Sequence, residues 1–286
     1  MTKRLASVVT VALACISQSS CGTYIPSQRD WPNGDSRLVS DMNTALVRSV
    51  VCELSYAVTI AVNNDLDLAK KRPSLKAYGS FLVDWGVEVA TDLKVTENST
   101  LAPGFSWTPD KAISITTGVS AEAVATNENK YNIFYPLSQL YRPDLFEKHN
   151  ETRPCRHPSG EKEGSPLVDI DLQILPLLES RIQIVQLGLA DDPKTLQEVM
   201  GVKNVLTQTV SIKENVSGNV TPKWEFTTRN VNPSGTFLSA GRERTHQLVF
   251  TFGPMAAGGR SLTPLAEQFH LNEQLKAGLR GSRDFQ

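Results

Sequence analysis

The hydrophobic pattern changes along the chain and marks its elements in turn. Residues 5–16 form an apolar run directly after Lys3 and Arg4. Such a run is too short to cross a bilayer as a helix, but it has the length and the basic flank of a signal peptide. We therefore predict a signal peptide over residues 1–20.

Helical spacing follows in residues 40–63. Apolar side chains recur every three or four positions there: Val47, Val50, Val51, Leu54, Val58, Ala61 and Val62. This spacing predicts one long amphipathic helix with Ser40 in its first turn. The polar run 63–65 predicts its end.

Alternation replaces helical spacing in residues 87–96. Val87, Val89, Thr91, Leu93 and Val95 occupy every second position there, and mostly polar residues lie between them. The pattern predicts a strand with one buried face. Further strands are predicted over residues 101–107 and, as one long or two shorter strands, over residues 112–135.

The second half of the chain repeats this order. A helix is predicted from Pro176 to about residue 187, and strands over residues 205–213 and 246–252. Residues 95–98 correspond to 212–215, residues 101–107 to 220–226, and residues 131–134 to 246–249. We predict an α+β fold with antiparallel sheet, in which a helix and a β-meander occur twice, over residues 36–140 and 165–255. The alternative is a chance likeness between two amphipathic hairpins.

Two further segments flank the second repeat. Residues 141–164 are rich in proline and charge, which predicts a linker loop. Residues 256–286 form a C-terminal tail with a helix over residues 262–279. Its apolar face contains Leu265, Phe269, Leu271, Leu275 and Leu279. This helix either packs across the sheet or awaits a partner.

The end of the signal peptide resembles a lipoprotein processing site. A polar run leads into Cys21, with small residues before the cysteine but Gln18 where leucine is usual. The similarity implies cleavage before Cys21 and acylation of its thiol, with residues 21–35 as an extended tether. Cys15 is the competing site, but cleavage there would cut inside the apolar run. The other alternative is an ordinary secretory signal with an incidental cysteine.

Export from the cytoplasm has consequences for the membrane to which the protein is sorted and for the oxidation state of its cysteines. Neither Cys15 nor Cys21 is followed by aspartate, which by similarity to other lipoproteins favours the outer membrane. The processed chain retains Cys52 and Cys155, and an oxidising compartment favours a disulfide between them over two buried thiols. The 29 basic and 30 acidic side chains give a net charge of -1, so we expect no binding to nucleic acid.

Catalytic and metal-binding signals are weak. No Gly-x-Ser-x-Gly elbow, His-Glu-x-x-His motif or phosphate-binding glycine loop occurs in the sequence. His149, Cys155 and His157 are zinc-binding residue types, but no fourth ligand is evident and a disulfide would remove Cys155. We therefore predict no metal and no cofactor. Asp169 and Asp171 alternate with apolar residues, which predicts that they share one strand face.

The densest polar segment covers residues 235–246. Within it Arg242, Arg244 and His246 are candidates for binding an anionic ligand. A solvated bend or sheet edge explains the same composition.

The strands also allow a membrane interpretation. They are about ten residues long, they alternate apolar and polar residues, and Trp107 and Trp224 flank them, as in strands of an oligomeric outer-membrane barrel. A half-buried soluble sheet has the same pattern.

Several segments together resemble a family of uncharacterised lipoproteins from Gram-negative bacteria. They are residues 21–26, the helix around Cys52, and residues 85–87, 105–109 and 234–254. The resemblance covers most of the processed chain. It implies an envelope address and this fold outline, but no activity or catalytic residues.

The sequence as a whole predicts a non-enzymatic, lipid-anchored envelope protein, facing the periplasm from the outer membrane, that presents a surface to another envelope protein. One alternative is a periplasmic ligand-binding protein or hydrolase that uses Arg242, Arg244 and His246. The second alternative is a subunit of an oligomeric outer-membrane β-barrel.

Overall fold

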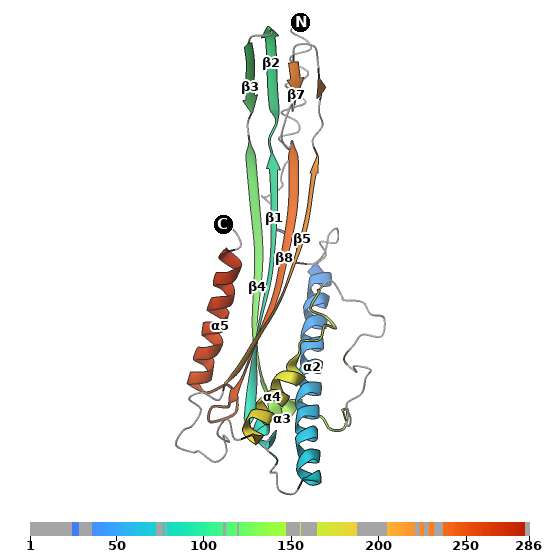
Figure 1. Cartoon of the computed structure of the whole chain (residues 1–286), viewed down its shortest axis with the longest axis vertical. Coiled ribbons are helices and arrows are strands. Elements are labelled where there is room, and N and C mark those ends of the chain that lie inside the picture. Colours follow the sequence, from blue (N-terminus) through green and yellow to red (C-terminus); the bar gives the residue numbers. More distant parts are fainter. Residues whose placement is uncertain are drawn as a thin grey trace. The chain divides into compact units, whose positions relative to one another are not determined.

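The protein has an α+β fold with an antiparallel sheet, as the sequence predicts. The computed structural model describes residues 25–28, 36–72, 77, 79–110, 113–118, 120–146, 155, 165–187, 205–220, 224–225, 229–231 and 237–283. The helices are α2 (Ser36–Lys71), the 3-10 helix η1 (Gly79–Asp84), α3 (Leu137–Leu140), α4 (Ile174–Gln186) and α5 (Pro264–Arg283). The strands are β1 (Trp85–Leu101), β2 (Gly104–Asp110), β3 (Ile113–Gly118), β4 (Ala121–Pro136), β5 (Leu206–Val220), β6 (Trp224–Glu225), β7 (Arg229–Val231) and β8 (Leu238–Pro254) (Figure 1).

The strands of each half pair as nested hairpins. One sheet has the order β4-β1-β8-β5 and the other the order β3-β2-β7-β6. Strand β1 therefore pairs with β4, and β2 pairs with β3, with Phe105 opposite Thr117. A meander would pair β1 with β2, so the predicted meander is replaced by a hairpin within a hairpin. Both halves nevertheless share the order of one helix followed by four strands.

Two junctions join the halves. Strand β1 is hydrogen-bonded to β8, and Ala102 N donates to Phe237 O beside this junction, at 2.8 Å. Strand β2 pairs with β7, with Phe105 opposite Val231. The first and second halves therefore contribute neighbouring strands to both sheets.

The compact units do not coincide with the predicted halves 36–140 and 165–255. Unit 1 consists of residues 1–28, 93–128 and 213–245, and unit 2 of residues 29–92, 129–212 and 246–286. Strands β1, β4, β5 and β8 each contribute residues to both units. Paired segments of neighbouring strands belong to the same unit, even where they are far apart in the sequence. The units therefore follow the strand pairing rather than the order of the chain.

Unit 2 has helices on both faces of its part of the sheet (Figure 1). On β8, His246 contacts Ser165 just before α4, whereas Thr251 contacts His270 of α5. Positions 246 and 251 differ by an odd number, so their side chains lie on opposite faces of the strand. The core of unit 2 is apolar and includes Leu54, Leu137, Leu178, Phe250 and Phe252.

Helix α2 is longer at both ends than predicted. The polar residues that suggested its end instead make tertiary contacts. Asn63 Oδ1 accepts from the Tyr141 hydroxyl at 3.0 Å, and Asn64 Nδ2 donates to Glu179 Oε1 at 2.8 Å. Asp65 is buried and accepts hydrogen bonds from Gly79 N and Gln186 Nε2, both at 2.6 Å. These partners remove the cost of polar groups inside a packed helix.

Helix α2 is also long and apolar enough over Val39–Lys71 to cross a membrane by length and composition alone. Most of its apolar window is buried within the protein. Ser49, Ser55 and Thr59 are hydrogen-bonded to the backbone of residues 169, 140 and 142. Buried hydroxyls that bind other segments are typical of a core helix.

Two other local predictions are wrong. Residues 166–169 form a turn rather than a strand, and Asp169 has a φ of 58°. Asp171 Oδ1 accepts from Gln173 N at 3.0 Å ahead of α4, so the two aspartates do not share a strand face. The last strand begins at Leu238 rather than near His246, because charged residues on it find partners across the sheet.

The predicted tether 21–35 is described only at residues 25–28, and there it is held on the protein. Gln28 is buried and its Nε2 donates to Leu93 O at 3.0 Å. Asn127 Nδ2 donates to Pro26 O at 3.0 Å. This part of the segment therefore packs on the strands of unit 1.

A disulfide joins Cys52 of α2 to Cys155, with a Cα–Cα distance of 5.5 Å. The described part of the predicted linker 141–164 is residues 141–146 and Cys155. The bond closes a loop over a sequence separation of 103 residues. It therefore ties this segment to the core helix of unit 2.

Replacing both cysteines, as Cys52→Ala with Cys155→Ala, should lower the free energy of unfolding by about 2–4 kcal/mol, because the unfolded chain regains the entropy of a long open loop. Urea unfolding of the oxidised wild type and of the double variant measures the difference. Reduced wild type serves as the matched control and should unfold like the variant. Equal stability of all three would contradict a structural bond.

Candidate functional site

The charged residues of β8 in unit 1 form ion pairs with neighbouring strands. Arg242 Nη1 pairs with Glu97 Oε1 of β1, and Arg242 Nη2 donates to Ser27 O. Arg242 thus links β1, β8 and the N-terminal segment 25–28. The partners of the partly buried guanidinium include this carboxylate and this carbonyl, which offset its charge locally.

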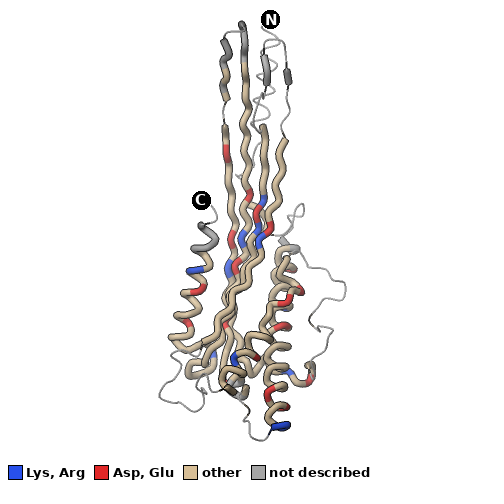
Figure 2. The backbone as a smooth tube through the Cα atoms, in the orientation of Figure 1, with Lys and Arg blue, Asp and Glu red and all other residues tan. Residues whose placement is uncertain are grey.

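Arg244 makes an equivalent ion pair with β5, the other neighbour of β8 in the sheet. Its Nε lies 2.9 Å from Glu214 Oε2 of β5, and its Nη2 donates to the same oxygen. Lys213 Nζ pairs with Glu243 Oε2 at 3.1 Å. Figure 2 shows the resulting juxtaposition of basic and acidic positions on these strands.

His246 belongs to unit 2 and has a different environment. Its ring is fully buried, and Nδ1 lies 2.9 Å from the hydroxyl of Ser165, which is also buried. Ser165 Oγ in turn accepts from Leu167 N at 3.3 Å. A serine and a histidine without solvent access hold a turn against the sheet, and a substrate could not reach them.

The predicted anion-binding cluster is therefore not gathered at one described pocket. Arg242 and Arg244 lie in unit 1, His246 lies in unit 2, and each is engaged by a different partner. Anion binding by these residues stays a prediction. The geometry itself favours a role in holding strands together.

Glu214→Gln should test that structural role. The side chain of Arg244 is 8% exposed, so removing the Glu214 carboxylate takes a charged partner from a buried cation and should cost about 1–3 kcal/mol. Glu243→Gln is the matched control, because its more exposed pair with Lys213 should contribute about 0–1 kcal/mol. Urea unfolding measures both, and equal losses would contradict the structural role.

A buried polar cluster lies beneath α5 in unit 2. His270 is 1% exposed, its Nδ1 lies 2.8 Å from Thr251 Oγ1, and its Nε2 lies 2.8 Å from Gln274 Nε2. Asn132 Oδ1 lies 3.3 Å from the same Nε2. Burial lowers the pKa of His270 to about 4, so the ring is neutral near pH 7.

Glu88 and Asn132 complete this cluster. Asn132 Nδ2 donates to Glu88 Oε1 at 2.5 Å, and Glu88 lies 3.9 Å from His270 Nε2. Burial raises the pKa of Glu88, and the hydrogen bond from Asn132 opposes that rise. The cluster therefore contains an acid and a base whose pKa values are both moved by burial.

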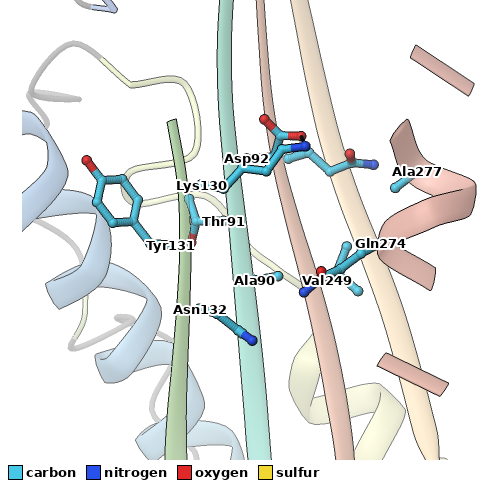
Figure 3. A pocket seen from close by; sticks show the side chains of 10 residues that line it. Ala90, Thr91, Asp92, Lys130, Tyr131, Asn132, Val249, Gln274 and Ala277 are labelled. Carbon is cyan, nitrogen blue, oxygen red and sulfur yellow. Dashed lines mark ion pairs between the residues drawn. The ribbon is translucent and has the colours of Figure 1, made fainter. Parts of the chain in front are cut away.

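A shallow cleft adjoins the cluster between α5 and strands β4, β1 and β8 (Figure 3). Its volume is about 130 Å³, which is small beside ordinary ligand pockets of about 300–1,000 Å³. Lys130 crosses its rim and pairs with Asp92 at 3.6 Å, whereas Tyr131 points away from it. The cleft suits a few water molecules better than a substrate.

Sequence reasoning missed Glu88 and His270 as partners. A usable signal existed, because Ala266, His270 and Gln274 recur at four-residue steps on the predicted helix. The predicted apolar face was different, and it is largely exposed: Phe269 is 40%, Leu271 55% and Leu275 65% exposed. The helix packs with its small and polar stripe because Gly253 and Ala266 allow close approach to the sheet.

The low pKa of His270 predicts acid destabilisation. The unfolded chain takes up a proton near pH 6.5, whereas the folded chain does so only near pH 4, so the free energy of unfolding falls as the pH falls through this window. The full loss should be about 3 kcal/mol. His270→Gln cannot titrate, so its stability should depend less on pH between 6.5 and 4 in urea unfolding. Parallel pH profiles for wild type and variant would contradict this assignment.

Other predicted site residues are constrained by the disulfide or lie outside the described residues. Cys155 cannot bind zinc while it is bonded to Cys52. Within the described residues, no group of three or more His, Cys, Asp or Glu side chains could hold a metal ion. Cys15, Cys21, His149 and His157 lie outside those residues.

Exposed apolar side chains distinguish the strands of unit 1. They are Phe105 (40% exposed), Val124 (56%), Val216 (71%), Val220 (59%) and Leu238 (40%). On β5, Val216 and Val220 share the face of Glu214, and on β8, Leu238 shares the face of Arg242 and Arg244. Both sets lie on one sheet face, because Glu214 pairs with Arg244.

The N-terminal segment 25–28 lies on that same face. Ser27 O accepts from Arg242, whose side chain projects there. The sheet face that exposes Val216, Val220 and Leu238 is thus the one on which the chain enters the fold.

Neither a protein-family model nor a curated protein sequence matches the chain.

Proposed function

We propose that the chain is a lipid-anchored protein of the bacterial cell envelope that acts through its strand surface and not by catalysis. Acylation of Cys21 would place the lipid only four residues before Ile25. An extended chain of that length reaches about 14 Å. The anchor would therefore insert close to the face that exposes Val216 and Val220.

The observation that carries the proposal is this shared face. Segment 25–28 is bonded to Arg242, whose face of the sheet also exposes Leu238, Val216 and Val220, so anchor and apolar surface would meet the same bilayer or the same membrane-bound partner. Exposed apolar patches mark interaction surfaces in otherwise soluble folds. The exposed Phe269, Leu271 and Leu275 of α5 offer unit 2 a surface of the same chemistry.

Catalysis has less support from the geometry. Arg242 and Arg244 bind carboxylates, and the Ser165–His246 pair is closed to solvent. The cleft beside α5 is too small for most substrates. Surfaces rather than a pocket are the chemically distinctive part of the described chain.

Mass spectrometry of the protein from its native host tests the address. We expect an N-terminus at Cys21 with added acyl mass, and Cys21→Ser should lose the acyl mass. Cys15→Ser is the matched control and should keep it, because Cys15 would be removed with the signal peptide. An intact Met1 without acyl mass in wild type would overturn the proposal.

A further inference from the structure

The two edge strands of the sheet β4-β1-β8-β5 are long, and their described residues contain few of the features that usually protect a sheet edge. Strands β4 and β5 end the order β4-β1-β8-β5, and they are 16 and 15 residues long. No position in either strand is buried, whereas β1 and β8 both contain runs of buried residues. Soluble proteins usually shorten such edges or interrupt them with proline or a bulge. Strand β4 has proline only at its last residue and β5 has none.

The chain contains an internal template for covering these edges. The helix-and-four-strand order occurs twice, so β1 corresponds to β5 and β4 corresponds to β8. The junction between the halves is β1 beside β8. Strand β5 of one copy beside β4 of another copy would repeat that junction with the corresponding strands.

Strand direction is compatible with this pairing. Neighbours alternate in direction in an antiparallel sheet, so β5 runs opposite to β4. A second β4 therefore extends the sheet beyond β5 without a break in alternation. Each edge strand contains both acidic and basic residues: Glu128 and Lys130 on β4, and Lys213 and Glu214 on β5. The two edges therefore do not present like charges to each other throughout.

We propose that copies of this chain join edge to edge, β5 to β4, into a closed ring of strands, and that the ring crosses or enters the membrane with the face of Val216 and Val220 outward. The partner is thus a second copy of the chain, and the orientation rests on the proposed lipid anchor. A head-to-tail interface gives either a ring or an open filament. Anchors in one membrane hold all copies at one height, which favours closure.

The alternation of β5 fits the two surfaces of such a ring. Val216 and Val220 share the face of the N-terminal segment, and an acyl chain must lie on the lipid side of the ring. The other face of β5 contains Lys213, Asn215, Ser217 and Asn219. On β5 beyond the Glu214–Arg244 ion pair, apolar residues thus lie outside and polar residues inside, which is the arrangement of strands that enclose an aqueous lumen.

Paired cysteines in the full-length protein test the edge contact in intact cells. Asn215 of β5 and Thr126 of β4 are exposed, and both lie on the polar face, because Thr126 is opposite Thr96 on β1 and Asn215 alternates with Glu214. Asn215→Cys with Thr126→Cys, treated with a short thiol crosslinker, should give a ladder of covalent multimers that ends at one largest species. Each single-cysteine variant should give no ladder.

Asn215→Cys with Ala125→Cys is the matched control, because positions 125 and 126 lie on opposite faces of β4. Its crosslinking should be at least about tenfold weaker. A monomeric mass for the detergent-solubilised wild type, or equal ladders from both cysteine pairs, would overturn the ring.

The two proposals fail separately. Acylated, membrane-bound protein without multimers would leave the lipid anchor standing and remove the ring. Multimers of a protein without acyl mass would keep the edge pairing and remove the anchor, and with it the assigned outward face.

Discussion

The hydrogen-bonded junction between β1 and β8 is the contact on which the rest of the fold depends. Each half of the chain alone supplies one nested hairpin, and an isolated pair of strands is marginally stable in water. Joining β1 to β8 makes both of them central strands, and only then can residues such as Val87, Leu93, Phe250 and Phe252 be buried. Helices α2, α4 and α5 cover the faces that this junction creates in unit 2. The internal repeat is therefore a way of building one sheet from two similar hairpins.

Polar chemistry inside the protein serves mainly to hold segments in place. Hydroxyls of α2 bind backbone groups of three distant residues, Asp65 joins η1 and α4 to α2, and His270 joins α5 to β8. The arginines of unit 1 join β1, β5 and the N-terminal segment to β8. Buried polar groups need such partners, and here the partners are internal. Exposed apolar side chains and exposed strand edges are what the described chain offers to other molecules.

Amphipathic strands can have two different meanings, and the environment of each part of the strand decides between them. In unit 2 the faces of β1 and β8 are covered by helices, so alternation there reflects a half-buried sheet. In unit 1 the apolar positions of β5 and the start of β8 remain exposed, while the N-terminal segment occupies part of the same face. One strand can therefore serve as core in one unit and as an interaction surface in the other.

The sequence by itself determined the helices, the strands, the α+β class and the repeated order, because spacings of 3.6 and 2 residues are local properties. It also placed Cys52 and Cys155 as candidates for one bond. The tertiary structure alone decided that β1 pairs with β4 and β8, that Asn63 to Asp65 continue a helix, and that α5 packs through Ala266 and His270 rather than through Leu271 and Leu275. Arg242, Arg244 and His246 are adjacent in sequence, yet their partners Glu97, Glu214 and Ser165 come from three separate segments. These contacts depend on which residues from distant segments come together in the fold, and the local spacing of apolar and polar residues does not specify that.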